Sequence, residues 1–204
     1  MKRILLATLL LIGISTTYAD SGQQPWYYGH GYVEGQIGMG QIQTPTSGFS
    51  NYSVGGFAWR VAGGYLLGQG HFNYGLELGY TGLPTNSYGA GGIEDTFNAG
   101  DIDLLFVGRY NFTDHWNIYG KFGPDFSMQK FAEPGGVHNY SKTFVLPKIG
   151  GGVGYQINQT VGLNLEADYA FGKSPSNVAD LTQAVLNQDG ISTLSVLFGV
   201  NISF

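Results

Sequence analysis

The sequence predicts an all-β fold, an eight-stranded antiparallel transmembrane up-and-down β-barrel, and three observations lead to this prediction. Bulky apolar residues alternate with small or polar ones in eight segments, a period-two pattern that is typical of strands with two different faces. The connections between these segments are alternately short and long. Only 11% of the residues are charged, against about 25% in typical soluble proteins, so much of the surface must face something other than water.

The eight expected strands account for most of the chain. In the second of them, Phe57, Trp59 and Val61 alternate with Ala58 and Arg60, and the other segments repeat the arrangement with different residues. Glycine, at 34 residues, and aromatic residues, at 15%, favour strands and tight turns over helices. The expected strands are residues 33–39, 57–67, 72–81, 102–111, 116–126, 148–157, 161–171 and 193–204.

The last expected strand ends on an aromatic residue. Its apolar face runs unbroken to the final position, whereas chain ends usually fray into water. If this strand closes the barrel against the first one, Phe204 becomes an anchor at the periplasmic rim. The apolar positions are Leu194, Val196, Phe198, Val200, Ile202 and Phe204, and between them lie Thr193, Ser195, Gly199, Asn201 and Ser203.

The connections fall into two kinds. Three are short, residues 68–71, 113–115 and 158–159, and four are long and polar, residues 41–55, 83–99, 129–143 and 172–190. The two kinds alternate strictly along the chain. This pattern is typical of membrane barrels, which have short periplasmic turns and longer external loops.

The chemistry of the two faces decides their orientation. Glycine, alanine, asparagine and charged residues fill the second face, which is too polar for the dry core of a soluble sandwich. In a bilayer the apolar face points to lipid and the polar face to the lumen. We expect two aromatic belts, with Phe72, Tyr65, Phe112, Trp116, Tyr155 and Phe204 near the short turns and Trp59, Tyr80, Phe126, Phe144 and Phe171 toward the long loops.

The N-terminus has the pattern of a secretory signal peptide. Lys2 and Arg3 precede an apolar run over residues 4–14, and small residues surround a cleavage site after Ala19. The run is too short to span a bilayer as a helix. We therefore expect a signal peptide at residues 1–19 and one barrel domain at residues 20–204, in a protein exported to the cell outer membrane of a Gram-negative bacterium.

Composition excludes several classes of function. Cysteine is absent, so disulfides, zinc–thiolate sites and a thiol nucleophile are excluded. No later apolar run is long enough for a membrane-spanning helix. Without Lys2 and Arg3, 7 basic residues face 14 acidic ones, a net charge of −7, which argues against nucleic acid as a partner.

Charged residues recur on the face that should point inward. Around the turn near residue 69, Arg60 lies diagonal to Glu77, and around the turn near 158, Lys148 falls near the level of Asp168. Because an eight-stranded barrel is just wide enough for its side chains, we expect a packed charge network in place of an open pore. The expected network is Glu34, Arg60, Glu77, Asp103, Arg109, Lys121, Asp125, Lys148, Glu166 and Asp168.

Several segments resemble the transmembrane domain of the OmpA family in order and spacing. They are "WYYGHGYVEGQIG", "NYGLELGYTGLP", "YNFTDHWNIYGKFG", "GGGVGYQINQTVGLNLEADYAFG" and the closing strand, which together cover essentially the whole mature chain. Family members often continue into a periplasmic peptidoglycan-binding domain. This sequence stops at its last strand, so we expect no such C-terminal domain and do not transfer that function.

The resemblance also implies an interior salt-bridge network. Glu77 and Glu166 occupy family-like acidic positions, and Lys121 matches a basic one. Gly154 stands where the family can carry Glu, and Asn164 where it carries Arg, so gating known for the family is in doubt. The alternating closing strand, with Phe198, Val200, Ile202 and Phe204, looks like the signal that the outer-membrane barrel assembly machinery reads.

Candidate catalytic and metal-binding residues form no convincing constellation. His138 with Ser141 could be a base and a nucleophile, but no spacing identifies an orienting acid or an oxyanion site. The other histidines, His30, His71 and His115, fall at the barrel entrance or in short turns. The acidic segment "IED" at 93–95 is more typical of a solvated loop than of a calcium site. The "GAGG" at 89–92 is more typical of a loop tip than of a phosphate-binding loop. We expect no enzyme activity, no metal and no cofactor.

The expected function is therefore structural or surface interaction of an adhesion type, with any specificity in the external loops. The first alternative is a narrow or gated, porin-like pore for ions or small solutes, and the second is an enzyme that modifies outer-membrane lipids. Residues 177–186 could form a short external helix with Val178, Leu181 and Val185 on one face. Expected partners are outer-membrane lipids and lipopolysaccharide, the barrel assembly machinery, and host or surface ligands at the loops.

Overall fold

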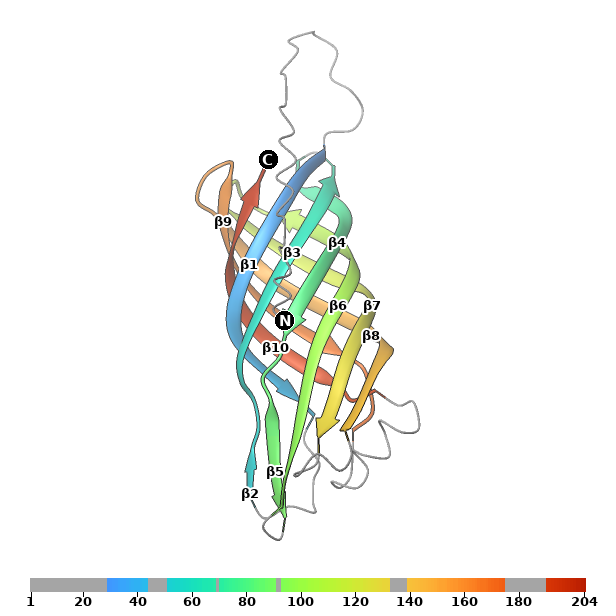
Figure 1. Cartoon of the computed structure of the whole chain (residues 1–204). Helices are drawn as coiled ribbons and strands as arrows, with labels where there is room; N and C mark the ends of the chain where they lie inside the picture. Colours follow the sequence, from blue (N-terminus) through green and yellow to red (C-terminus); the bar gives the residue numbers. More distant parts are fainter. Residues whose placement is uncertain (1–28, 44–50, 69, 91–92, 133–138, 175–189) are drawn as a thin grey trace, which may run out of the picture.

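The computed structural model describes residues 29–43, 51–68, 70–90, 93–132, 139–174 and 190–204. Within these residues, ten strands form one antiparallel sheet that curls into a tilted barrel (Figure 1). The same residues contain no helix long and apolar enough to cross a membrane. The expected signal peptide, His138, Gly91–Gly92 of the "GAGG" tip and residues 177–186 lie outside the described ranges.

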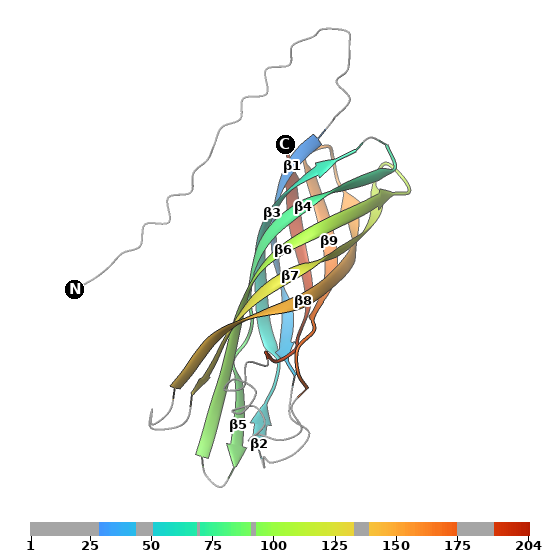
Figure 2. The same cartoon turned by 90° about the vertical axis from the view of Figure 1, so that its right-hand side faces the viewer.

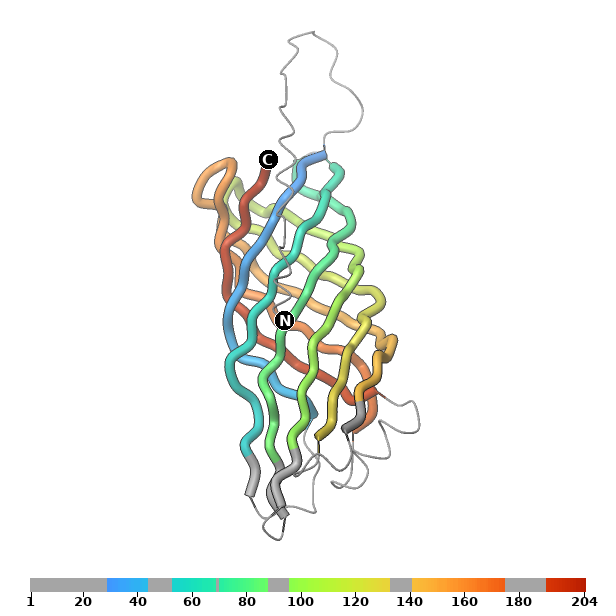
Figure 3. The backbone as a smooth tube through the Cα atoms, in the orientation of Figure 1, coloured from blue at the N-terminus to red at the C-terminus, as the bar shows by residue number. Residues whose placement is uncertain are grey.

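Eight strands make the closed barrel, in the order β1, β3, β4, β6, β7, β8, β9 and β10, and β10 pairs with β1 to complete the ring. The predicted eight-stranded fold is confirmed, and the tube in Figure 3 follows the strands around the common axis. The strands are β1 (Gly29–Ile42), β3 (Gly56–Leu67), β4 (Phe72–Gly82), β6 (Ile93–Asn111), β7 (Trp116–Ala132), β8 (Asn139–Gln156), β9 (Val161–Ala170) and β10 (Thr193–Ser203), with two short additions, β2 (Asn51–Ser53) and β5 (Asn86–Ala90).

The closing pair extends to the last residue. Strand β1 pairs with β10 from Tyr32↔Ser203 to Ile42↔Thr193. Beyond that register, the Gly31 and Phe204 backbones exchange two hydrogen bonds of 3.0 and 2.9 Å. The terminal residue is thus held in the sheet, which leaves no open edge among the eight barrel strands.

The three predicted short turns join β3 to β4, β6 to β7 and β8 to β9. In the first, Gly70 adopts a φ of 73°, a left-handed conformation that glycine adopts without a steric penalty. In the second, the Thr113 hydroxyl accepts hydrogen bonds from the backbone N–H groups of His115 and Trp116. The turns lie at the same end of the barrel as the C-terminus (Figure 1).

The outer face of the barrel is apolar. Ile37, Phe57, Leu78 and Phe122 each expose more than half of their surface, at 59%, 64%, 59% and 58%. Aromatic pairs mark both ends of this face, with Trp116 and Tyr155 at 4.9 Å near the turns and Trp59 and Tyr80 at 5.4 Å toward the other end. A wall of this composition is suited to hydrocarbon between two interfaces.

Strands β6, β7 and β8 extend well past the expected membrane span, as Figure 2 shows at the end of the barrel opposite the C-terminus. The prediction of loops over residues 83–99 and 129–143 is therefore wrong for much of both ranges. In these extensions the chemistry of the faces is reversed. Phe97 and Phe131 point inward at 0% and 1% exposure, whereas Asn98 and Lys130 face outward and are exposed.

The reversal explains why the extensions were missed. Strands in water hold apolar residues inside and polar residues outside, so the lipid-facing pattern ends where the membrane does although the backbone pairing continues. Phe144 of β8 is a further correction, because it was expected in the outer aromatic belt. It is only 5% exposed and packs in the interior with Leu146 and Ala170.

A closed barrel of this kind predicts heat-dependent gel mobility. Because every spanning strand is paired on both sides, unboiled protein refolded in detergent should stay folded in dodecyl sulfate and run differently from boiled protein. The measurement is electrophoresis of matched boiled and unboiled samples. A mature chain that dissolves as a monomer without detergent, with one mobility throughout, contradicts the lipid-facing wall.

Candidate functional site in the barrel interior

The ten charged residues expected inside come from seven of the eight barrel strands. Nine are at most 6% exposed, and Arg109 is half-buried near the short turns. Eight of the ten form three connected groups around the side chains of Arg60, Lys121 and Lys148, which are the buried cations of the described residues. The groups share carboxylates, so they make one continuous network.

Arg60 of β3 is fully buried and forms the first group. Its two terminal nitrogens donate to both oxygens of Asp103 at 2.5 and 2.8 Å, which is the bidentate geometry that a guanidinium favours. It also donates to Glu77 at 2.8 Å and to the Thr81 hydroxyl at 2.9 Å. The diagonal placement of Arg60 and Glu77 around the first turn thus brings their side chains into direct contact.

Lys121 of β7 forms the second group and contacts three carboxylates across the lumen. Its ammonium nitrogen lies 3.1 Å from Glu34, 2.9 Å from Glu77 and 2.7 Å from Glu166. One oxygen from each of these carboxylates lies within 4.8 Å of the others, a spacing that would suit a metal ion. The ammonium group already occupies the space between the three carboxylates and donates a hydrogen bond to each of them.

Lys148 of β8 forms the third group, with partners that differ from the expected one. Its ammonium nitrogen lies 2.8 Å from Asp103 and 3.5 Å from Asp125. In the sheet register Lys148 stands opposite Ala170, and Asp168 stands opposite Gly150. Both carboxylate partners of Lys148 lie on the other side of β8 from β9, on the adjacent strand β7 and on β6 beyond it.

Asp168 is the unbalanced member of the network. It is 3% exposed, and neither carboxylate oxygen has a hydrogen-bond partner within the described residues. Its neighbour on the same face of β9, Glu166, is also acidic. The described interior buries seven carboxylates, counting Asp101, against three cations, so acidic groups outnumber their basic partners.

Several uncharged or unexpected residues complete the network. The hydroxyls of Tyr32 and Tyr119 donate to Glu77 at 2.5 Å and to Glu166 at 3.0 Å. Asp101 accepts from the Ser127 hydroxyl at 2.7 Å. The sequence did not lead us to expect Tyr32, Tyr119 and Asp101 in the network. The period-two alternation nevertheless places them on the inward face. Tyr119 lies two residues before Lys121, and Asp101 two before Asp103, on the same inward face.

The two departures from the OmpA pattern have simple structural settings. Asn164 donates to Glu34 at 2.8 Å, so an amide supplies the hydrogen bond at a position where the family carries Arg. At Gly154, an added Cβ would meet the Asn117 side chain. A larger residue there would require Asn117 to move.

Apolar layers lie on both sides of the charge network. Toward the short turns, Tyr32, Leu66 and Val107 pack together at 2% exposure or less. Toward the other end, a larger cluster is buried inside the extended strands: Ile42, Ala58, Leu83, Phe97, Ala99, Phe131, Ile191 and Leu197. The charged groups are therefore enclosed between two apolar layers.

The remaining predicted residues lie apart from this network. His71 and His115 lie in short turns, each with its Nδ1 beside a backbone carbonyl oxygen, of Asn111 at 2.7 Å and of Gln156 at 2.9 Å. Ser141 is exposed on β8, far from those turns along the strand. Phe198, Val200, Ile202 and Phe204 face outward at 52%, 42%, 45% and 64% exposure.

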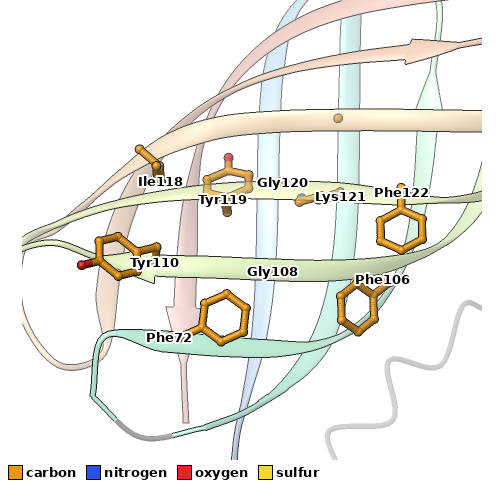
Figure 4. A pocket seen from close by; sticks show the side chains of 10 residues that line it. Phe72, Phe106, Gly108, Tyr110, Ile118, Tyr119, Gly120, Lys121 and Phe122 are labelled. Carbon is orange, nitrogen blue, oxygen red and sulfur yellow. The ribbon is translucent and has the colours of Figure 1, made fainter.

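The outer wall also carries a shallow apolar groove of about 480 Å³, shown in Figure 4. Gly108 and Gly120 pair across β6 and β7, and their missing side chains leave the hollow. Aromatic rings of Phe72, Phe106 and Phe122 surround it. The groove lies on the lipid-facing side, and Tyr119 and Lys121, whose side chains belong to the interior network, also contribute to its lining.

The Lys121 group predicts a large effect of removing its charge. In the Lys121→Met variant three buried carboxylates lose their shared cation, which should cost about 3–5 kcal/mol of unfolding free energy. The matched Lys130→Met change, on an exposed outer position, should stay within about 0.5 kcal/mol. Urea unfolding in phospholipid vesicles, followed by tryptophan fluorescence, makes the comparison. Equal stabilities of the two variants contradict the role of Lys121.

Asp168 predicts an effect of the opposite sign. Asp168→Asn removes a buried charge that has no hydrogen-bond donor, so the variant should be as stable as the parent or more stable. Glu166→Gln, two residues away, weakens a 2.7 Å contact with Lys121 and should lower stability. The readout is the temperature at which the unboiled gel band converts to the boiled one. A loss in Asp168→Asn as large as in Glu166→Gln contradicts this account.

Comparisons with known proteins agree with this architecture. The chain is similar in structure to Ail, the attachment invasion locus protein of Yersinia pestis, in complex with the heparin analogue sucrose octasulfate, with 12% identity over 85% of this chain and 99% of Ail and a TM-score of 0.52. It is also similar to Neisserial surface protein A, with 14% identity over 85% of this chain and 97% of that protein and a TM-score of 0.52. At such identities the likeness concerns the fold.

The search of curated protein sequences finds no match. The family model described as the outer membrane protein beta-barrel domain, in contrast, matches residues 5–204. That range includes all ten strands and both apolar layers. The protein therefore belongs to the outer membrane protein β-barrel domain family.

Proposed function

We propose that this outer-membrane barrel is a closed scaffold with a structural or surface-interaction role of the adhesion type. The observation that carries the proposal is the filled interior. Arg60, Lys121 and Lys148 tie seven strands together through buried ion pairs, and apolar layers lie above and below them. An interior of this kind offers no continuous path for water.

The outer end supports a role in presentation. Strands β6, β7 and β8 continue past the lipid-facing wall and are packed around Phe97 and Phe131. Gln129 of β7 fixes the segment that precedes β10, because its amide donates to the Ile191 carbonyl at 2.8 Å and accepts from the Ile191 N–H at 2.9 Å. Rigid hairpins outside the membrane form a firm base for loops that contact partners.

The proposal includes the expected partners. The apolar wall suits outer-membrane lipids, and its outer rim suits lipopolysaccharide. The outward row of Phe198, Val200, Ile202 and Phe204 is proposed as the signal that the barrel assembly machinery reads, after removal of residues 1–19. The similar Ail structure holds a heparin analogue, so a sulfated saccharide is a reasonable first probe for the outer end.

Conductance and adhesion test the proposal together. In planar bilayers the refolded protein should give no regular current steps, because the lumen is filled. On the surface of a non-adherent Gram-negative host, the protein should increase attachment to heparin-coated plates and cultured epithelial cells. Replacing residues 133–138, which connect β7 to β8, with Asn-Gly should reduce that attachment several-fold.

Asp114→Asn is the matched control, since Asp114 lies in a short turn at the opposite end. It should leave attachment unchanged. Discrete current steps in the parent protein would favour the narrow-pore alternative. A change in the mass of lipid A on expression would favour a lipid-modifying enzyme.

A further inference from the structure

The short-turn end of the barrel contains a polar cavity of about 660 Å³ that the proposed function does not use. Its volume falls in the range of small-molecule sites, about 300–1,000 Å³. Residues of six strands and all three short turns line it. The layer of Tyr32, Leu66 and Val107 separates it from the charge network deeper inside.

Arg109 of β6 is the cation of this cavity. Its guanidinium carbon lies 5.6 Å from the centre of the Tyr32 ring, and its Nε is buried without a hydrogen-bond partner. Within the described residues, the ion pairs and side-chain hydrogen bonds include none made by Arg109. Of the ten residues expected in the interior network, Arg109 and Asp168 are the two that form no ion pair within the described residues.

Tyr32 explains why Arg109 has no carboxylate partner. The Tyr32 hydroxyl donates to Glu77 at 2.5 Å, and the face of the same ring receives the guanidinium. Glu77 is already engaged by Arg60 and Lys121. The Tyr32 ring therefore lies between Glu77, whose charge is already paired, and a guanidinium that has no carboxylate partner.

The surroundings of Arg109 suit an oxyanion. Asn73 stands opposite Arg109 in the β4–β6 register, and Asn117 projects into the same cavity from β7. Both are buried, at 6% and 7% exposure, and their amides can donate hydrogen bonds. His30, His71 and His115 also line the cavity, so three imidazoles share it with the guanidinium.

A negative group belongs to the cavity as well. Asp114 is exposed in the second turn and lines the cavity. It forms no ion pair with Arg109 in the described structure. The donors of Arg109 thus remain available to a ligand.

We propose that the periplasmic mouth of the barrel binds an oxyanion group, carboxylate or phosphate, of a small molecule through Arg109, with Asn73 and Asn117 as supporting donors. A guanidinium forms two parallel hydrogen bonds with either group. The site faces the periplasm, so its ligand is a periplasmic solute or the end of a periplasmic chain. This site is independent of the outer hairpins and of the adhesion proposal.

Calorimetric titration of the refolded full chain tests the site, in a neutral detergent at low ionic strength. Inorganic phosphate and succinate are the two probes, and glucose is the uncharged control. At least one of the two oxyanions should bind saturably. The probe with the higher affinity shows whether the site prefers a phosphate or a carboxylate group. Arg109→Gln should weaken that binding on the order of tenfold, the effect of losing a charge-assisted hydrogen bond.

Two further variants keep the result interpretable. Lys130→Gln removes the same charge at the opposite end of the barrel and should change the affinity less than twofold. Asn117→Asp places a carboxylate in the cavity and should weaken binding even if Arg109→Gln does not fold, which unboiled gel mobility reports. Absence of saturable binding in the parent, or equal affinities in the parent and both cavity variants, overturns the proposal.

Discussion

The closed ring of backbone hydrogen bonds is the constraint on which the rest of this structure depends. In hydrocarbon, an unpaired backbone N–H or C=O group costs several kcal/mol. The last strand of the sheet must therefore pair with the first. The pairing of β1 with β10, continued to Gly31 and Phe204, meets this requirement. Once the ring is closed, each strand has one face toward lipid and one toward the enclosed interior.

The enclosed face then has to be filled, and the chain fills it in layers of different chemistry. Charges occupy the middle, where Arg60 and Lys121 each bind more than one carboxylate. Apolar residues occupy the levels above and below. Ion pairs in such a place are stabilising mainly because the alternative, an unpaired buried charge, is so unfavourable. Asp168 and Arg109 are the exceptions, because neither charge forms an ion pair within the described residues.

Much of the fold could be predicted from sequence because period-two alternation is a local signal. The eight strands, the three short turns and the outward face follow from it, and the contact of Arg60 with Glu77 follows from hairpin register. The contact of Lys148 with Asp103 could not be found in this way, because Asp103 lies two strands away in the ring. Cross-lumen contacts depend on barrel diameter and stagger, which neighbouring residues do not encode. The outer extensions were missed for another reason, the exchange of polar and apolar faces between Ile102 and Asn98.

That exchange of faces also sets how deeply the molecule is immersed. On the outward side of β7, Phe126 is followed after four residues by Lys130, and β6 changes from Ile102 to Asn98 at the same level. If the barrel lay deeper in the membrane by these four residues, the Lys130 ammonium group would approach the hydrocarbon. The free-energy cost of a lipid-facing Lys rises with depth to about 2–4 kcal/mol. Raising it would bring apolar rings into water. The wall itself thus holds the outer hairpins at a fixed height above the lipid head groups.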